Sequence, residues 1–355
     1  MNMTDFGRII LCMAFAVLAA SMSSAQDKGV VYCDASAFPL YGKCIEETSA
    51  RYERLPAEFK GVVRGPLWDL GRNSAGLYIR FRSNSTQIRA RWKSTSPRQY
   101  MPHMTDAGDS GLDLYILTEK DGWRFAGSGF DWGGRDKNVK NKTIIANMTP
   151  DMREYMLYLS MYNGIEELEL GIDEGAVIEA PAVESPKTER PVVMYGTSIL
   201  QGGCTSRPGM AFTAILGRKL DREVINLGFS GNARLDYEIA EYITRVQNPS
   251  LIVLDYVPNS SAELINERGE KFFRIIRDAF PDVPVILVED PTFPHTRFAL
   301  YKKLKKAGEK RLYYVSTDGL IGDDGEATVD GVHFTDLGMM RYVERVLPVM
   351  RKALR

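Results

Sequence analysis

Three residues with the chemistry needed for acyl transfer occur in the C-terminal half of the chain. Ser198 comes shortly after an apolar run, and Asp330 stands three residues before His333. A serine hydroxyl becomes a strong nucleophile only when a neighbouring imidazole removes its proton. A carboxylate on the other ring nitrogen holds that imidazole in the required tautomer. We therefore expect Ser198 to be the nucleophile, His333 the base and Asp330 the group that orients it.

Acyl transfer also needs hydrogen-bond donors that face the developing oxyanion. Gly231 offers an unhindered backbone N–H and Asn259 offers a side-chain amide. With the backbone N–H of Ser198, they form the expected oxyanion hole. Each residue also has an ordinary structural interpretation, since serine caps helices, glycine permits tight turns and asparagine bonds nearby backbone. It is their joint placement that favours a functional role.

The elements that must position these residues alternate between short apolar runs and amphipathic patterns. Strands are expected at Val192–Tyr195, Val224–Leu227, Leu251–Leu254, Val285–Val288 and Leu312–Val315, and helices near Ala211–Leu220, Leu235–Thr244, Ala262–Phe280 and from Asp336. This alternation of strands and helices predicts an α/β domain with a mostly parallel sheet covered on both faces. Ligands bind beyond the carboxyl ends of such strands, and the candidate residues all follow strands at that edge.

The first half of the chain shows a period of two instead. Alternating residues begin at Leu77 and again at Ile88, which predicts two half-buried antiparallel strands. Further strands are expected at Leu112–Leu117, Trp123–Gly127, Glu154–Leu159 and Leu168–Ile172. Short strands without a helical pattern predict a β-sandwich. We therefore expect a sandwich domain over residues 26–182, a linker near 180–186 and the α/β domain over 190–355.

Length and composition limit the function classes. The 355 residues fit two domains of about 150 residues each. Lys and Arg number 45 against 46 Asp and Glu, so no basic excess is present for a nucleic-acid partner. With only 3 His, a His-rich metal centre is not expected, and the expected reaction requires neither a metal nor an organic cofactor. The oligomeric state is left open.

Residues 1–25 have the character of a signal peptide. Arg8 precedes an apolar run from Ile9 to Ala20, and Ser23-Ser24-Ala25 fits a cleavage site. The run is shorter than the roughly 20 residues of a membrane-spanning helix. We expect an exported protein, periplasmic or extracellular, with no membrane span once the leader is removed; an uncleaved anchor is the alternative.

Export permits a disulfide, and Cys33 and Cys44 flank a segment that can turn back on itself. Their pairing stays open, because connectivity cannot be determined from sequence. Cys204 would then remain as a small buried thiol.

The motifs together resemble those of the SGNH, or GDSL-like, hydrolase superfamily. The resemblance covers residues 190–355 and rests on Gly196-Thr197-Ser198, Gly231, Asn259 and the pair Asp330 and His333. It implies a flavodoxin-like domain and a serine esterase with a covalent acyl-enzyme. The first half resembles the β-sandwich, jelly-roll-like module that precedes this domain in some exported bacterial proteins, with Gly111-Leu112-Asp113-Leu114-Tyr115 as its tag.

Two positions depart from the family pattern. Thr197 stands where an Asp usually precedes the nucleophile, and the third block reads Val257-Pro258-Asn259-Ser260 instead of Gly-x-Asn-Asp. The first departure does not touch a catalytic residue of the family pattern, and the second keeps only the Asn of its block. Two other histidines are considered. His295 follows a strand at the same edge and is the rival base. His103 belongs to the other domain, and whether it reaches the cleft across the domain interface stays open.

The sequence thus predicts an exported esterase that removes short acyl groups, acetyl in particular, from carbohydrates. Arg207 and His295 are candidate substrate-binding residues. A lipase that acts on longer acyl esters is one alternative. The other is a carbohydrate-binding protein with an inactive hydrolase-like domain, in which Trp123, Trp132 and Tyr100 would stack on sugars.

Overall fold

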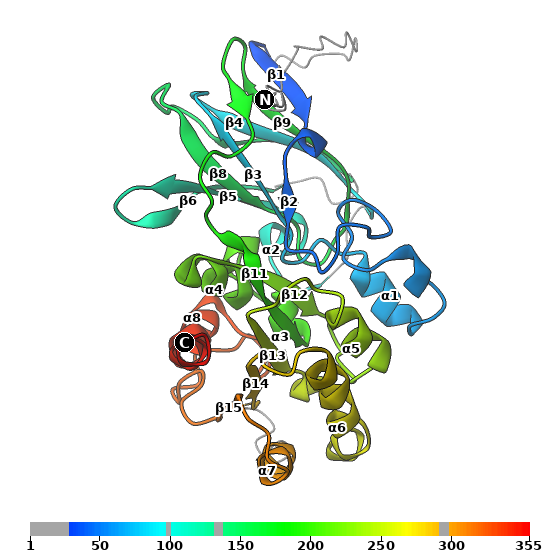
Figure 1. Ribbon diagram of the computed structural model, residues 1–355. Coiled ribbons are helices and arrows are strands. Elements are labelled where there is room, and N and C mark those ends of the chain that lie inside the picture. The colour runs from blue at the N-terminus through cyan, green and yellow to red at the C-terminus, as the bar shows by residue number, and fades with distance from the viewer. Residues whose placement is uncertain (1–27, 97–100, 131–137, 291–297) are drawn as a thin grey trace, which may run out of the picture.

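The computed structural model describes residues 28–96, 101–130, 138–290 and 298–355. The predicted leader, Tyr100, Trp132 and His295 lie outside these ranges. The chain forms a β-rich N-terminal part, at the top of Figure 1, which sits on a C-terminal part with a parallel sheet and helices. Over the described residues, no helix combines the length and apolar character that a membrane crossing requires.

The N-terminal part is a sandwich of two antiparallel sheets. One sheet has the order β1 (Val30–Asp34), β9 (Ile165–Asp173), β4 (Ile88–Ser94) and β7 (Val139–Ile145). The other has the order β10 (Ile178–Glu179), β3 (Tyr78–Ser83), β8 (Arg153–Tyr158), β5 (Leu112–Thr118) and β6 (Gly122–Gly129), and β2 (Leu40–Tyr41) also pairs with β3. Apolar side chains from both sheets meet between them, including Phe81 and Trp92. The predicted antiparallel sandwich is confirmed.

The sandwich differs from the expectation in two respects. β3 and β4, which are consecutive along the chain, lie in opposite sheets and do not pair with each other. The strand β3 was expected to be half-buried, but both of its faces are covered, and Tyr78 and Arg80 are buried. The module also contains short helices that the sequence did not predict: α1 (Gly65–Gly71), α2 (Asp106–Ser110) and single 3-10 turns at Ala35–Ala37 and Ala57–Phe59.

The C-terminal part contains the predicted parallel sheet. Its strand order is β12 (Arg222–Gly228), β11 (Lys187–Gly196), β13 (Leu251–Asp255), β14 (Val285–Val288) and β15 (Leu312–Val315). The chain thus starts at β11, adds β12 on one side and then continues on the other side. In open α/β sheets, ligands bind at the strand end where the strand order reverses, which here is the carboxyl end of β11.

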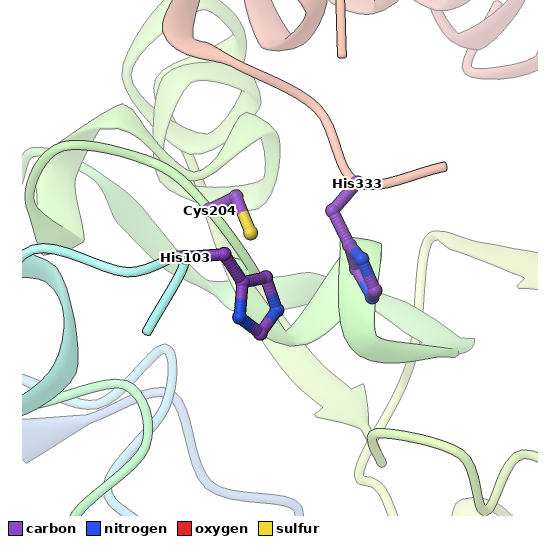
Figure 2. Close-up of side chains that lie close together, drawn as sticks. All are labelled: His103, Cys204 and His333. Carbon is purple, nitrogen blue, oxygen red and sulfur yellow. The ribbon is translucent and has the colours of Figure 1, made fainter. Parts of the chain in front are cut away.

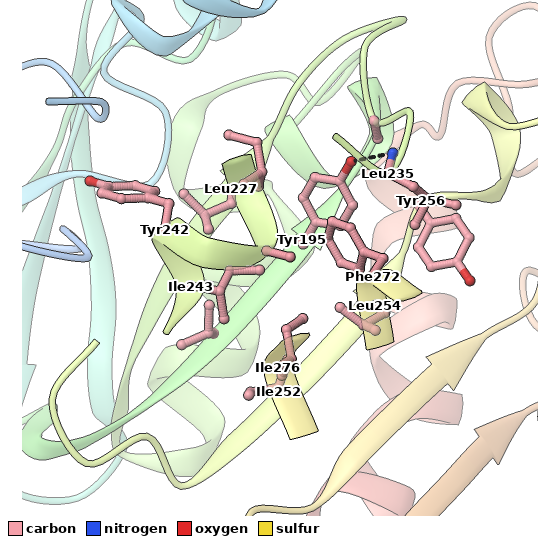
Figure 3. Close-up of a cluster of buried hydrophobic side chains, with 14 of the residues drawn as sticks. Tyr195, Leu227, Leu235, Tyr242, Ile243, Ile252, Leu254, Tyr256, Phe272 and Ile276 are labelled. Atoms are coloured by element: carbon pink, nitrogen blue, oxygen red, sulfur yellow. Dashed lines mark hydrogen bonds between the residues drawn. The ribbon is translucent and has the colours of Figure 1, made fainter. Parts of the chain in front are cut away.

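Helices cover both faces of this sheet, because alternate side chains of each buried strand point to opposite faces. Val192 and Met194 of β11 pack with α3 (Ser198–Gln201), α4 (Phe212–Leu220) and α8 (Asp336–Ala353). Val193 and Tyr195 pack with α5 (Tyr237–Ile243), α6 (Ala262–Ala279) and α7 (Phe298–Lys306), and α7 was not predicted. Figure 3 shows part of this second cluster around Tyr195 and Phe272, whose rings stack.

Cys33, Cys44 and Cys204 are free thiols. Cys33 lies in β1 and its Sγ is 3.6 Å from the carbonyl oxygen of Leu170 in the neighbouring strand. Cys44 is buried in the cluster that contains Tyr195. Because the two side chains enter different cores, the disulfide that the sequence allowed is not formed.

Candidate active site

Ser198 lies at the carboxyl end of β11, where it is the first residue of α3 and is 5% exposed. Gly196, two residues earlier, has no room for a side chain, because a Cβ there would lie 2.4 Å from the carbonyl oxygen of Asp255. Thr197, which replaces the usual Asp, accepts a hydrogen bond from the backbone N–H of Ile199 and begins the helix. The strand-to-helix turn therefore presents Ser198 at the sheet edge.

His333 and Asp330 meet Ser198 from the loop that precedes α8. The Ser198 Oγ is 2.9 Å from Nε2 of His333, and Nδ1 of His333 is 2.7 Å from Oδ2 of Asp330. Both separations are hydrogen-bond distances, and they connect the three side chains in the order that acyl transfer requires. The structure thus brings together the three residues that the sequence singled out.

Asp330 is held in its ionised form. Burial alone would raise the pKa of this carboxyl group, but hydrogen bonds from the His333 side chain and from the backbone N–H groups of His333 and Val332 lower it to about 2. Its Oδ1 accepts the two backbone bonds, at 2.8 Å and 3.0 Å, which leaves Oδ2 for the imidazole. Asp330 is therefore an oriented anion throughout the neutral pH range.

The candidate oxyanion donors lie on two neighbouring loops. Gly231 follows β12 with a φ of +67°, and Asn259 ends a 3-10 turn after β13. The Asn259 Oδ1 accepts a hydrogen bond of 3.3 Å from the backbone N–H of Ala233, and the Ser260 hydroxyl donates to the Ala233 carbonyl oxygen at 2.9 Å. Ser260, which replaces the usual Asp, therefore helps to hold the two loops together. The oxyanion role of Gly231, Asn259 and the Ser198 N–H stays a prediction.

Residues of the sandwich also hold the nucleophile, and the sequence did not reveal them. The Tyr162 hydroxyl donates a hydrogen bond of 3.0 Å to the carbonyl oxygen of Ser198. The buried Gln201 side chain donates to Met161 at 3.1 Å and to Asn73 at 3.2 Å, and it accepts a bond from the backbone of Ser230. No periodicity or motif marks such contacts, because the partners lie in separate domains.

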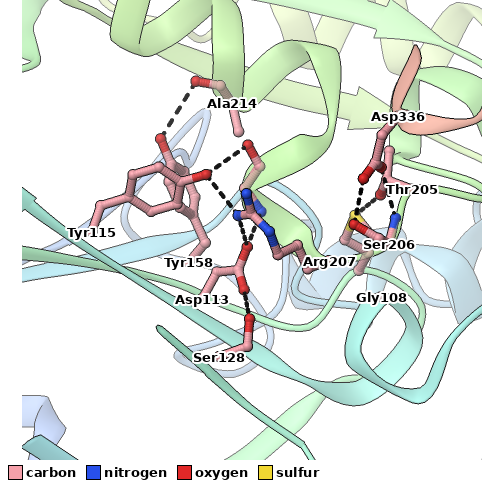
Figure 4. Close-up of polar contacts among 12 residues, drawn as sticks. Gly108, Asp113, Tyr115, Ser128, Tyr158, Thr205, Ser206, Arg207, Ala214 and Asp336 are labelled. Atoms are coloured by element: carbon pink, nitrogen blue, oxygen red, sulfur yellow. Dashed lines mark hydrogen bonds and ion pairs between the residues drawn. The ribbon is translucent and has the colours of Figure 1, made fainter. Parts of the chain in front are cut away.

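The loop after Ser198 is fastened to the sandwich by Arg207 (Figure 4). Arg207 donates hydrogen bonds of 2.8 Å to Asp113 and to the hydroxyl of Tyr115, two residues of the sequence tag in the N-terminal module. Its guanidinium lies 3.8 Å from the centroid of the Phe125 ring. Arg207 thus binds the sandwich through an ion pair, a hydrogen bond and a ring contact. Its predicted contact with substrate, like that of His295, stays a prediction.

His103 extends from the sandwich toward the site. Its ring centroid is 5.3 Å from that of His333, and Cys204 lies beside both rings (Figure 2). His103 therefore reaches His333 across the domain interface, a point that the sequence left open.

Two family models together match most of the chain. Residues 30–178 match the GxDLY module, described as the N-terminus of SGNH-hydrolase-type esterases. Residues 189–300 and 297–351 match the GDSL-like lipase/acylhydrolase family. Among curated proteins, none matches this chain.

Solved structures show the same two-part arrangement. A protein of Bacteroides ovatus described as a GDSL-like lipase is 32% identical, covers 92% of this chain and 98% of its own, and has a TM-score of 0.85. The salicylyl-acyltransferase SsfX3 of a tetracycline biosynthetic pathway is 15% identical, with 92% and 99% coverage and a TM-score of 0.73. A family two carbohydrate esterase of Cellvibrio japonicus is 12% identical, with 92% and 98% coverage and a TM-score of 0.57.

The fold and the matched models define an ester-cleaving hydrolase with an N-terminal β-rich module. This chain belongs to the SGNH, or GDSL-like, hydrolase superfamily.

Proposed function

We propose that this protein is an exported esterase that removes short acyl groups, acetyl in particular, from carbohydrates. The observation that carries the proposal is the hydrogen-bonded series of Ser198, His333 and Asp330, with contacts of 2.9 Å and 2.7 Å. These contacts support the roles of nucleophile, base and orienting carboxylate for the three residues.

The proposed reaction proceeds through an acyl-enzyme. His333 takes the Ser198 proton as Oγ attacks the acyl carbon, and the N–H groups of Ser198 and Gly231 with the Asn259 amide bind the resulting oxyanion. The intermediate collapses when His333 returns the proton to the sugar oxygen. Water, activated by His333 in turn, then releases the carboxylic acid and restores the Ser198 hydroxyl.

The surroundings of Ser198 support a short acyl group. The loop that follows it, residues 201–207, is polar and rich in glycine, with no run of large apolar side chains that could line a long acyl tunnel. The shared arrangement with the Cellvibrio japonicus carbohydrate esterase supports the carbohydrate substrate as a fold analogy. The predicted leader supports export.

Ester turnover by a Ser198→Ala variant tests the mechanism. Hydrolysis of p-nitrophenyl acetate should fall by at least about a thousandfold, while the circular dichroism spectrum stays that of the wild type. Ser316→Ala is the matched control, because Ser316 also follows a strand of the same sheet but lies outside the site. A folded Ser198→Ala variant with more than about a tenth of wild-type activity would disprove the mechanism.

The substrate class is tested by a chain-length series. kcat/KM for p-nitrophenyl esters should fall steeply from acetate to octanoate, because each added methylene must be accommodated in the site. Release of acetate from acetylated xylan or mannan is measured alongside. A rise toward octanoate would favour the lipase alternative, and binding of these glycans without any turnover would favour the binding protein.

A further inference from the structure

We propose that His103, Cys204 and His333 form a Zn²⁺ site that inhibits the esterase. Figure 2 shows these side chains converging from three separate segments: the loop before α2 in the sandwich, the loop after α3, and the loop before α8. Their potential ligand atoms all lie within 4.8 Å of one another. The inhibition, though not the binding, rests on the proposed function.

The geometry suits a tetrahedral metal. Zn–N bonds of about 2.0–2.1 Å and Zn–S bonds of about 2.3 Å place the ligand atoms of a tetrahedral site roughly 3.4–3.6 Å apart. Side-chain rotations that bring the atoms about 1 Å closer therefore complete the site. Two imidazoles and one thiolate are ligands that zinc takes readily, and three protein ligands leave a fourth position for water.

The Nε2 atom of His333 is available to bind a metal ion. Asp330 accepts the Nδ1–H at 2.7 Å, so Nε2 carries the free electron pair. A carboxylate behind a ligating imidazole orients the ring and increases its basicity, as in many zinc sites. The Nε2 atom is also the one that contacts Ser198 at 2.9 Å. A metal bound there occupies the electron pair that must accept the Ser198 proton, and the reaction stops.

The backbone conformation of Cys204 is a separate indication that its thiol has a functional role. Cys204 has a φ of +71°, in the left-handed region where a residue other than glycine is strained. Strained residues of this kind are concentrated at functional sites. The residue is 8% exposed, and its side chain faces the two imidazoles.

When the Zn–S bond forms, the thiol releases its proton to solvent. The bound metal acts as an inhibitor and takes no part in the proposed reaction, which requires none.

Metal titration of the full protein, after removal of bound metal with a chelator, tests the site by two readouts. The first is the thiolate-to-metal absorption band on addition of Co²⁺, which needs no enzyme activity. The second is the Zn²⁺ concentration that halves hydrolysis of p-nitrophenyl acetate, compared for each variant with its own metal-free rate. Cys204→Ser keeps the size of the side chain but lacks the soft ligand, and His103→Gln removes the imidazole. Cys33→Ser is the control, since it removes a free thiol of the sandwich.

We expect one Co²⁺ per chain with a thiolate band that Cys204→Ser abolishes and Cys33→Ser leaves unchanged. The half-inhibitory Zn²⁺ concentration should rise by at least about tenfold in Cys204→Ser and in His103→Gln. No band in wild-type protein, or equal Zn²⁺ inhibition in all variants, would overturn the proposal. A normal band in a protein without ester turnover would leave the metal site standing and refute the proposed function instead.

Discussion

Asp113 of the sandwich and Arg207 of the hydrolase domain form an ion pair of 2.8 Å across the domain interface, and the Asp113 side chain is completely buried. The same carboxylate accepts hydrogen bonds from Ser128 and from the backbone of Gly209. Burial raises the pKa of Asp113, and the neighbouring Arg207 opposes that shift. The pair thus links the module to the loop that follows Ser198.

The first prediction concerns this pair. Arg207→Ala leaves the buried Asp113 without its cationic partner, so the free energy of unfolding should fall by about 3 kcal/mol in urea titrations. The control is Arg124→Ala: Arg124 and Asp121 form a pair whose side chains are 63% and 46% exposed, and its loss should cost less than about 1 kcal/mol. Equal losses of stability for the two substitutions would show that the interface pair contributes no more to the free energy of unfolding than an exposed ion pair.

The second prediction concerns orientation of the base. Asp330→Asn should lower kcat by about 10³–10⁴-fold, because the amide no longer holds the required imidazole tautomer. Asp318→Asn, in the loop after β15, is the control. An unchanged rate and pH–rate profile in Asp330→Asn would show that other groups orient His333.

Asp330 also makes a defined contribution to stability. Its pKa of about 2 lies below the ordinary value of 3.8, so its stabilising effect is present above about pH 4 and is lost as the pH falls toward 2. Asp330→Asn should therefore show a smaller loss of stability over that range than the wild type. Unfolding titrations between pH 2 and pH 5 measure the difference.

The third prediction concerns the altered third block. Asn259→Ala should lower kcat by about 10²–10³-fold with little change in KM, if its amide binds the oxyanion. Ser260→Ala removes only the bond to Ala233 that joins the two loops, so its effect should be smaller and of the same kind. A decrease of less than about threefold for Asn259→Ala would exclude its amide from the oxyanion hole.

The fourth prediction concerns Glu223 in β12. Burial raises the pKa of this carboxyl group to about 7, although the backbone N–H of Gly42 donates to it at 2.6 Å. Because the folded-state pKa lies above the ordinary 4.5, the stability associated with Glu223 is complete below about pH 4.5 and is lost as the pH rises through 7.

In the wild type, the free energy of unfolding should therefore fall by about 1–3 kcal/mol from pH 5 to pH 8. Glu223→Gln should remove this fall, because an amide does not titrate in this range. The exposed Glu241→Gln serves as the control. Parallel pH profiles for Glu223→Gln and the wild type would contradict the assignment. Urea titrations at both pH values provide the measurement.

Local patterns predicted most elements of the hydrolase domain. The four-residue apolar runs at β14 and β15 and the amphipathic α6 were predicted within about two residues. A strand inside a covered sheet is a continuous apolar run, and a helix buried on one face shows a period of 3.6 residues. The opposite placement of β3 and β4 was not predictable, since an alternating strand indicates that it has an inner face but not which sheet it joins. The short α1 and α2 lack enough turns to show a period.

The sequence by itself determined the order of the functional residues along the chain and the sheet edge to which they belong. Parallel strands all end on the same side, so Ser198, Asn259 and His333 had to gather there. Only the tertiary structure decided what the sandwich contributes: the Tyr162 bond to Ser198, the Asp113 pair with Arg207, and the approach of His103 to His333. These contacts arise from the docking of two separately patterned domains, and no local period encodes the surface that one domain presents to the other.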